Sequence, residues 1–268
     1  MNKIQSNFVI YVPRKLVRNE MELELKKGVL MAFCWIKRKG SIDGMYSTTL
    51  RFLMNEYGLH YDESKTKRLP KQASIILKGF NYLIENEYAS LIQGSYRTLD
   101  SFFVIKMKNE KFDEQFIPLK IKYFDYVIEY KKRADKMGLL YTLLFVLSCY
   151  SMKTTENSKE RLVACSYSIE YISKLTGIPK ISLFNYLNAL STEEGYFADT
   201  PLIKSKPYHK KIENRIIRFS NIFVENKANA HDVISYQRKI IDEKFKMKTI
   251  NSKSEIYNFD DLDNFEFY

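Results

Sequence analysis

Hydrophobic positions follow a helical period in some segments and a β-type pattern in others, and the same order of segments occurs twice. Each half opens with an aromatic and β-branched segment, at 8–12 and at 123–128, followed by a basic turn and a long apolar helix, at 22–38 and at 134–152. A shorter amphipathic helix then ends at a glycine with an aliphatic residue after it, Gly58-Leu59 and Gly177-Ile178. A third helix and a two-stranded hairpin complete each half. This order predicts two copies of one domain.

A repeated tetrapeptide supports the duplication. Phe-Asn-Tyr-Leu stands at 80–83 and again at 184–187, in the third helix of each copy. The copies differ in length at turns, because the first has an insertion at 60–69 and the second a longer hairpin at 201–214. Insertions of this kind are typical of a structural repeat. We therefore predict domains at 1–120 and 121–227.

The remaining chain is predicted to form a polar helix at 228–249 and a flexible acidic tail at 250–268. The helix has one apolar stripe at helical spacing, made of Val233, Tyr236, Ile240, Ile241 and Phe245.

The clearest local pattern covers residues 168–190. Ser168 is placed to cap a helix, Gly177 can take the left-handed conformation that ends it, and Pro179 suits the first turn of the next helix. The apolar residues expected to face the core are Ile169, Ile172 and Leu175 in the first of these helices and Phe184, Leu187 and Leu190 in the second. The pattern predicts a helix-turn-helix, with a plain helical hairpin as the alternative.

Together these elements predict an α+β protein, mostly α with small β hairpins, made of two tandem winged helix-turn-helix domains.

The net charge of the chain agrees with a polyanionic partner. The 43 Lys and Arg against 32 Asp and Glu give a net charge of +11. Five of the acidic residues lie beyond Lys253, where no basic residue follows, so the rest of the chain carries 43 basic and 27 acidic residues, a net +16. Such a field attracts nucleic acid or an anionic membrane surface, although a lysine-rich genome would produce part of it.

Three segments are expected to contact double-stranded DNA. Their Asn and Ser side chains would bind bases, and their Lys and Arg side chains would bind phosphates. The alternatives are solvated polar faces and a merely soluble loop. In the first copy the expected residues precede or line the third helix: Lys67, Arg68, Lys71, Gln72, Ser74 and Lys78. In the second copy they form the outer face of the third helix: Lys180, Ser182, Asn185 and Asn188. The hairpin of the second copy supplies Lys204, Lys206, Tyr208, His209, Lys210, Lys211 and Arg215.

No motif in the sequence favours catalysis. Neither a G-x-x-x-x-G-K-[ST] loop nor a G-x-G-x-x-G loop is present, and the three histidines are isolated at His60, His209 and His231. We therefore expect no enzyme activity, cofactor or metal. Cys34, Cys149 and Cys165 are widely separated, which fits a reducing cytoplasm. The most apolar run, 137–152, is too short to cross a bilayer, so no membrane partner is expected.

Two winged helices in one basic chain of this size resemble the replication initiators of theta-replicating plasmids, whose two domains bind successive major grooves of origin repeats. The opening Tyr11-Val-Pro-Arg-Lys-Leu16, followed by the apolar helix over 25–36, is similar to the start of initiators from low-GC Gram-positive plasmids and phages. The resemblance implies sequence-specific DNA binding and a role in initiating replication. A transcriptional regulator of a mobile element is the alternative.

The end of the chain, 257–268, alternates acidic and aromatic residues. Such a segment suits a basic groove on a replication or transcription protein, or on this protein's own DNA-binding face. A winged-helix module that docks to proteins through this tail is therefore a further alternative. A homodimer also stays open.

Overall fold

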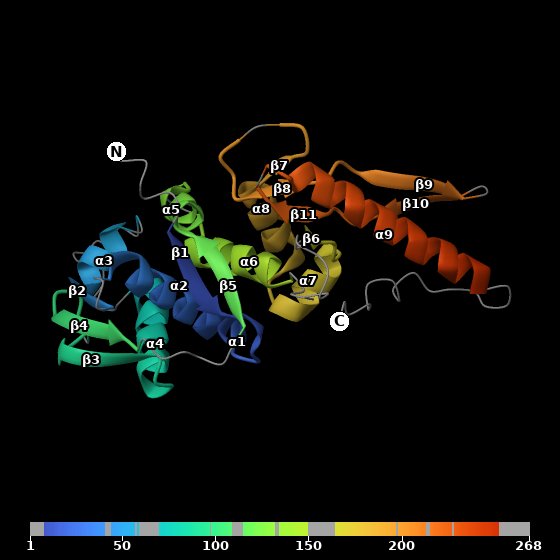
Figure 1. The fold of residues 1–268 in the computed structure, drawn as a ribbon. Coiled ribbons are helices and arrows are strands. Elements are labelled where there is room, and N and C mark those ends of the chain that lie inside the picture. Colours follow the sequence, from blue (N-terminus) through green and yellow to red (C-terminus); the bar gives the residue numbers. More distant parts are fainter. Residues whose placement is uncertain are drawn as a thin grey trace. The chain divides into compact units, whose positions relative to one another are not determined.

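The structure is a computed structural model of the 268-residue chain. It describes residues 8–40, 44–56, 58, 70–96, 98–108, 115–131, 134–149, 164–196, 198–212, 215–226 and 228–251, with the side chains of 210–219 and 244–251 outside the description. Helices combine with small, mainly antiparallel sheets, so the α+β prediction is confirmed (Figure 1). Across these residues no helix has the length and apolar character needed to span a membrane.

The chain divides into two compact units, residues 1–145 and 146–268. The boundary predicted at residue 120 falls inside the first unit. That unit contains, in chain order, β1 (Val9–Pro13), α1 (Arg14–Arg18), α2 (Leu23–Lys39), β2 (Met45–Thr49), α3 (Leu50–Glu56), α4 (Lys71–Glu85), β3 (Ala89–Gly94), β4 (Phe102–Met107), β5 (Phe116–Lys120), α5 (Ile121–Glu129) and most of α6 (Lys136–Ser148).

The core of the first unit forms around α2, in which every residue from Lys26 to Ile36 is buried. Helix α4 packs against α2 so closely that the two helices meet at Gly28 and Gly79. A Cβ atom on Gly79 would lie 2.4 Å from the carbonyl carbon and oxygen of Gly28, and one on Gly28 would lie 2.2 Å from the carbonyl oxygen of Ile75. Only glycine allows this approach, since real Cβ contacts are not so short.

A three-stranded antiparallel sheet, in the order β2-β4-β3, covers this helix pair. Its central strand β4 alternates between exposed and buried positions and turns Phe103, Ile105 and Met107 inward. A separate antiparallel pair joins β1 to β5, with Ile10 opposite Leu119. The strand predicted at 8–12 is therefore present, with a partner that the sequence pattern did not indicate.

The strand predicted at 123–128 is wrong, because this segment belongs to helix α5. Its aromatic and β-branched composition is typical of a strand. However, Tyr123, Phe124 and Val127 are the buried residues, and their i, i+1, i+4 spacing places them on one face of a helix. Here the helical period decided the local structure.

The second unit contains β6 (Ala164–Cys165), α7 (Ile169–Thr176), α8 (Lys180–Leu190), β7 (Ser191–Glu193), β8 (Leu202–Lys204), β9 (Tyr208–Ile212), β10 (Arg215–Phe219), β11 (Phe223–Glu225) and α9 (Ala230–Asn251). Four strands form a sheet in the order β6-β11-β8-β7, in which β7 and β8 are parallel and the other pairs antiparallel. Strands β9 and β10 form their own antiparallel hairpin.

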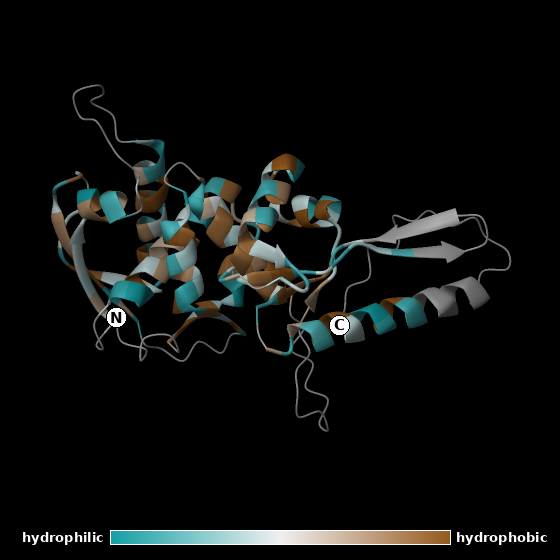
Figure 2. Ribbon diagram, turned by 90° about the horizontal axis from the view of Figure 1, so that it is seen from above, coloured by the Kyte–Doolittle hydropathy of each residue, from teal (hydrophilic) through white to brown (hydrophobic). Residues whose placement is uncertain are grey.

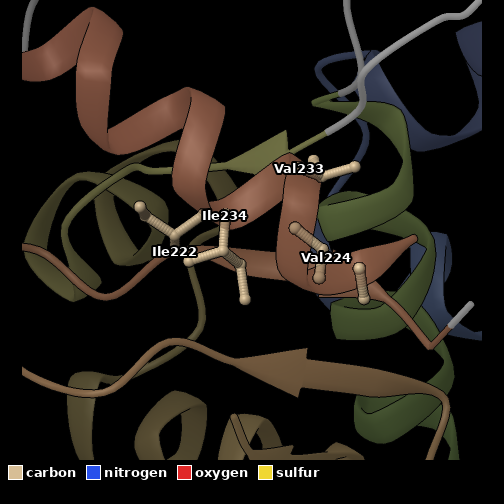
Figure 3. Close-up of a cluster of buried hydrophobic side chains, with 5 residues drawn as sticks. Ile222, Val224, Val233 and Ile234 are labelled. Atoms are coloured by element: carbon tan, nitrogen blue, oxygen red, sulfur yellow. The ribbon is translucent and has the colours of Figure 1, made fainter. Parts of the chain in front are cut away.

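Helix α9 lies where a helix was expected at 228–249, and Figure 2 shows it as a largely hydrophilic helix with hydrophobic residues at intervals. Val233 and Ile234 pack with Ile222 and Val224 in a buried cluster (Figure 3). The predicted stripe is thus wrong in part, since Ile234 is buried while Tyr236 is 49% exposed. The side chain of Phe245 and the tail from residue 252 onward lie outside the described residues.

One order of elements occurs twice along the described chain: helix, strand, helix, helix, strand, strand. The first series is α2-β2-α3-α4-β3-β4, and the second is α6-β6-α7-α8-β8-β11, to which β7 and the β9–β10 hairpin are added. The strand pairing is also the same. In the first series β4, the last strand, lies between β2 and β3, and in the second β11, the last strand, lies between β6 and β8. The strands β2 and β6 were not expected from the sequence.

Candidate nucleic-acid interface

Hydrogen bonds cap α7 at its start and tie its end to the segment that leads into α8. The Ser168 hydroxyl accepts a hydrogen bond from the Tyr171 N–H at 3.1 Å, so the predicted helix cap is confirmed. Gly177 ends α7 with a φ of +71°, in the left-handed region. The Ser173 hydroxyl then donates to the Ile178 carbonyl at 2.6 Å, which ties α7 to the start of the next segment. Pro179 stands at the N-cap of α8, one position before the first turn.

Helix α8 faces the core through Leu183, Leu187 and Leu190, which are at most 1% exposed. Phe184 was expected on this face, and that prediction is wrong because its side chain is 51% exposed. The leucines occupy i, i+4 and i+7, and a residue one position later is turned by about 100° away from them. Leu175 in α7 was also expected to be buried and is 42% exposed, while Thr176 beside it is buried.

The outer face of α8 lies opposite these leucines and is formed by Ile181, Asn185 and Asn188 at the same i, i+4, i+7 spacing, with Phe184 beside them. Ile181 is 79% exposed, and both asparagines are exposed. Ser182 is half-buried at the edge of this face. Sequence reasoning missed Ile181, although its spacing from the two predicted asparagines was a signal that could have found it.

The lysines on and next to α8 lie close to glutamates. No acidic residue lies within the helix itself, and the exposed Lys180 pairs with Glu170 of α7 at 3.6 Å. The Lys204 ammonium donates to the Asn188 side-chain oxygen at 3.3 Å and lies 3.8 Å from Glu193. With only 19% of its side chain exposed, Lys204 is less accessible than a free basic loop residue would be.

The β9–β10 hairpin carries the densest run of predicted basic residues. Its register pairs Tyr208 with Phe219 and Ile212 with Arg215. Lys206, just before the hairpin, and His209 within it are exposed. Lys210, Lys211 and Arg215 lie on the strands, but their side chains are outside the described part.

The start of this hairpin is tied to α9. The Tyr208 hydroxyl donates to the Asp242 carboxylate at 2.8 Å, and Arg238 donates to Glu194 at 2.9 Å and to the Lys206 carbonyl at 3.3 Å. Burial and, after it, the hydrogen bond to Asp242 raise the pKa of Tyr208. Tyr208 was predicted to contact DNA, and the structure gives it a partner on α9, Asp242, which helps to fix the hairpin.

In the first unit, α4 separates its basic and apolar stripes as predicted. Lys71, Gln72 and Lys78 are exposed, and Ser74 is half-buried. Ile76, Phe80 and Leu83 are fully buried on the opposite side. The Lys71 ammonium lies 3.8 Å from Glu24 but its side chain remains 79% exposed.

Asn81 shares the exposed face of α4 and was not predicted. Its side-chain oxygen accepts a hydrogen bond from the Tyr96 hydroxyl at 2.8 Å. It is the counterpart of Asn185 in the repeated tetrapeptide, and both asparagines are exposed. The first residue of the tetrapeptide differs, because Phe80 is buried and Phe184 is exposed. Lys67 and Arg68 lie outside the described residues.

Within the described ranges, no group of three or more His, Cys, Asp and Glu side chains is placed to hold a metal ion. These surfaces present hydrogen-bonding groups, positive charge and apolar side chains. Comparison of the sequence with protein-family models and with curated proteins finds no match.

Proposed function

We propose that this chain is a sequence-specific double-stranded DNA-binding protein whose two series of elements are winged helix-turn-helix domains. In such a domain the second and third helices form the helix-turn-helix, and the sheet that follows carries a hairpin that contacts the backbone. The repeated helix-strand-helix-helix-strand-strand order and the common strand pairing support this reading. Helices α4 and α8 would then be the recognition helices.

The observation that carries the proposal is the outer face of α8. Its central residues are Asn185 and Asn188, whose amides suit base edges, on a helix with no acidic residue. The basic β9–β10 hairpin follows in the same unit and would hold phosphates.

The resemblance to plasmid and phage initiators makes replication initiation the biological role that we propose. A regulator of transcription from a similar element would use the same surface. Selection of bound sequences from a native-genome DNA pool separates the two roles, since an initiator selects repeated sites and a regulator selects a lone operator.

The first test is the salt dependence of binding to duplex DNA of random sequence. We expect micromolar or tighter binding at low salt, weakening by about 10³-fold between 50 and 200 mM salt if about six phosphates are contacted. Absence of binding even at low salt would overturn the proposal.

Charge reversal tests which surface is responsible. Lys206→Glu with Lys210→Glu is expected to weaken binding to every sequence alike. The matched control is Lys122→Glu with Lys131→Glu, two exposed lysines on or just after α5, because it changes the net charge by the same amount. Equal losses in both variants would show an effect of net charge alone.

Asn185→Ala should relax the preference among sequences, and an unchanged preference would contradict the assignment of α8.

A further inference from the structure

Ile181 and Phe184 give α8 an outer face of unusual composition. A solvated helix face is expected to be polar, yet Ile181 is 79% exposed and Phe184 is 51% exposed. Ile181 lies in line with Asn185 and Asn188, on the side opposite the buried leucines. The face therefore combines two apolar side chains, Ile181 and Phe184, with two amides, Asn185 and Asn188, along two helical turns.

This combination of apolar and amide side chains matches the major-groove edge of A·T pairs. Adenine offers N7 and N6, which an asparagine amide bonds with two hydrogen bonds, and thymine offers a 5-methyl group that favours apolar contact. In a G·C pair, cytosine has only a hydrogen at C5 where thymine has its methyl, so an isoleucine loses that apolar contact, and the cytosine amino group stands where thymine has O4. Apolar and amide side chains together thus favour A·T over G·C.

The spacing of residues along α8 also matches the spacing of base pairs in the groove. Residues four apart on a helix rise by about 6 Å, and two base-pair steps of B-DNA rise by about 6.8 Å. Ile181 and Asn185 can therefore reach base pairs within one short stretch of the groove. Lys204 lies beside the same face, 3.3 Å from the Asn188 side-chain oxygen and 3.8 Å from Glu193.

We infer that α8 reads A·T pairs, with Ile181 and Phe184 in contact with thymine methyl groups and Asn185 and Asn188 bonded to adenine edges. This inference rests on the proposed DNA-binding function and adds the chemical group that is recognised.

The test replaces thymine by deoxyuridine, one position at a time, in a duplex selected by the purified full chain. Deoxyuridine keeps base pairing and O4 and lacks only the methyl group. We expect one or two thymines at which the replacement raises the Kd about fourfold, the loss for one methyl group that stays exposed to water. At those thymines, Ile181→Ala or Phe184→Ala should bind thymine and deoxyuridine duplexes equally well.

Leu175→Ala is the matched control, because Leu175 is an exposed apolar residue of α7 outside this face. It should keep the wild-type penalty for deoxyuridine. All three side chains are exposed, so each variant should unfold at the wild-type temperature, which circular dichroism checks.

The outcomes separate this inference from the proposed function. No salt-sensitive DNA binding at all overturns both. Specific binding in which every deoxyuridine changes the Kd by less than twofold overturns the inference alone, as does a penalty that persists in both α8 variants. If Ile181→Ala instead changes the oligomeric state in sedimentation and leaves DNA binding intact, the face contacts protein and the inference fails.

Discussion

Replacing Gly79 by alanine should force α2 and α4 apart. A Cβ atom at this position would lie 2.4 Å from the carbonyl carbon and oxygen of Gly28, and those are backbone atoms that cannot rotate away. Ordinary van der Waals contact begins at 3.4 Å, so the helices must separate locally by about 1 Å. Because α4 carries the exposed Lys71 and Lys78, this crossing also fixes the helix that we propose to contact DNA.

Two effects of the substitution oppose each other. Alanine favours a helix over glycine by about 1 kcal/mol. Overpacking of a close contact costs about 1–3 kcal/mol, and opening the interface also weakens dispersion contacts along both helices. Since the clash is with backbone, we expect the larger cost to prevail and the free energy of unfolding to fall by about 2 kcal/mol, which corresponds to a Tm lower by roughly 4–8 °C.

The single tryptophan allows the loss of stability to be measured in the first unit. Trp35 lies in α2 and is 1% exposed, so its fluorescence will change when this core opens in urea. Lys78→Ala is the matched control, because it introduces the same alanine one residue earlier on the exposed face of α4. Its free energy of unfolding should change by less than about 0.5 kcal/mol.

A double substitution tests the mechanism. Gly28→Ala should destabilise by itself, and the pair Gly28→Ala with Gly79→Ala should cost less than the sum, because the first alanine already separates the helices. A Gly79→Ala protein as stable as the wild type, or strictly additive losses in the pair, would refute the close crossing.

Other consequences concern a cap, a buried hydroxyl and the thiols. Ser168→Ala removes the hydrogen bond to the Tyr171 N–H and should lower the unfolding free energy by about 1 kcal/mol in urea, whereas Ser168→Asp should keep most of it. Burial raises the pKa of Tyr141 to about 12, above its unfolded value near 10. The free energy of unfolding is then unaffected by this group below pH 10 and falls as the pH rises through 12, by about 3 kcal/mol; Tyr141→Phe should flatten that fall when unfolding is measured as a function of pH. Thiol labelling of the native protein should modify Cys149, which is half-buried, well before the fully buried Cys34, whose pKa burial raises; equally rapid labelling of both would contradict the packing of α2.

Local signals of helix ends were sufficient to predict part of the fold. Ser168 and Gly177 act through one hydrogen bond and one backbone conformation, so their roles can be read from neighbouring residues alone. The separation of basic and apolar stripes on α4 was predictable for the same reason, because several residues at helical spacing agreed.

Features that depend on distant partners could not be predicted in this way. The two-residue strand β6 exists because β11 pairs with it, and β5 exists as the partner of β1. The face of α8 was misjudged at Phe184, because Leu183 and Phe184 are both suitable core residues and only the packing selects between them. The partner of Tyr208 on α9 was beyond sequence reasoning, since 34 residues separate it from Asp242.

The two proposed recognition helices differ in the chemistry that they present. The exposed face of α4 includes two lysines, Lys71 and Lys78, and so offers charge, which acts on any sequence through the phosphates. The central stripe of α8 is uncharged, with Ile181 in line with Asn185 and Asn188, and so offers apolar contact and hydrogen bonds, which depend on the base pair. If both bind DNA, α4 supplies affinity that salt weakens, and α8 supplies discrimination that salt leaves largely unchanged. The duplication would then have produced two unequal recognition helices, one for attachment and one for selection of the site.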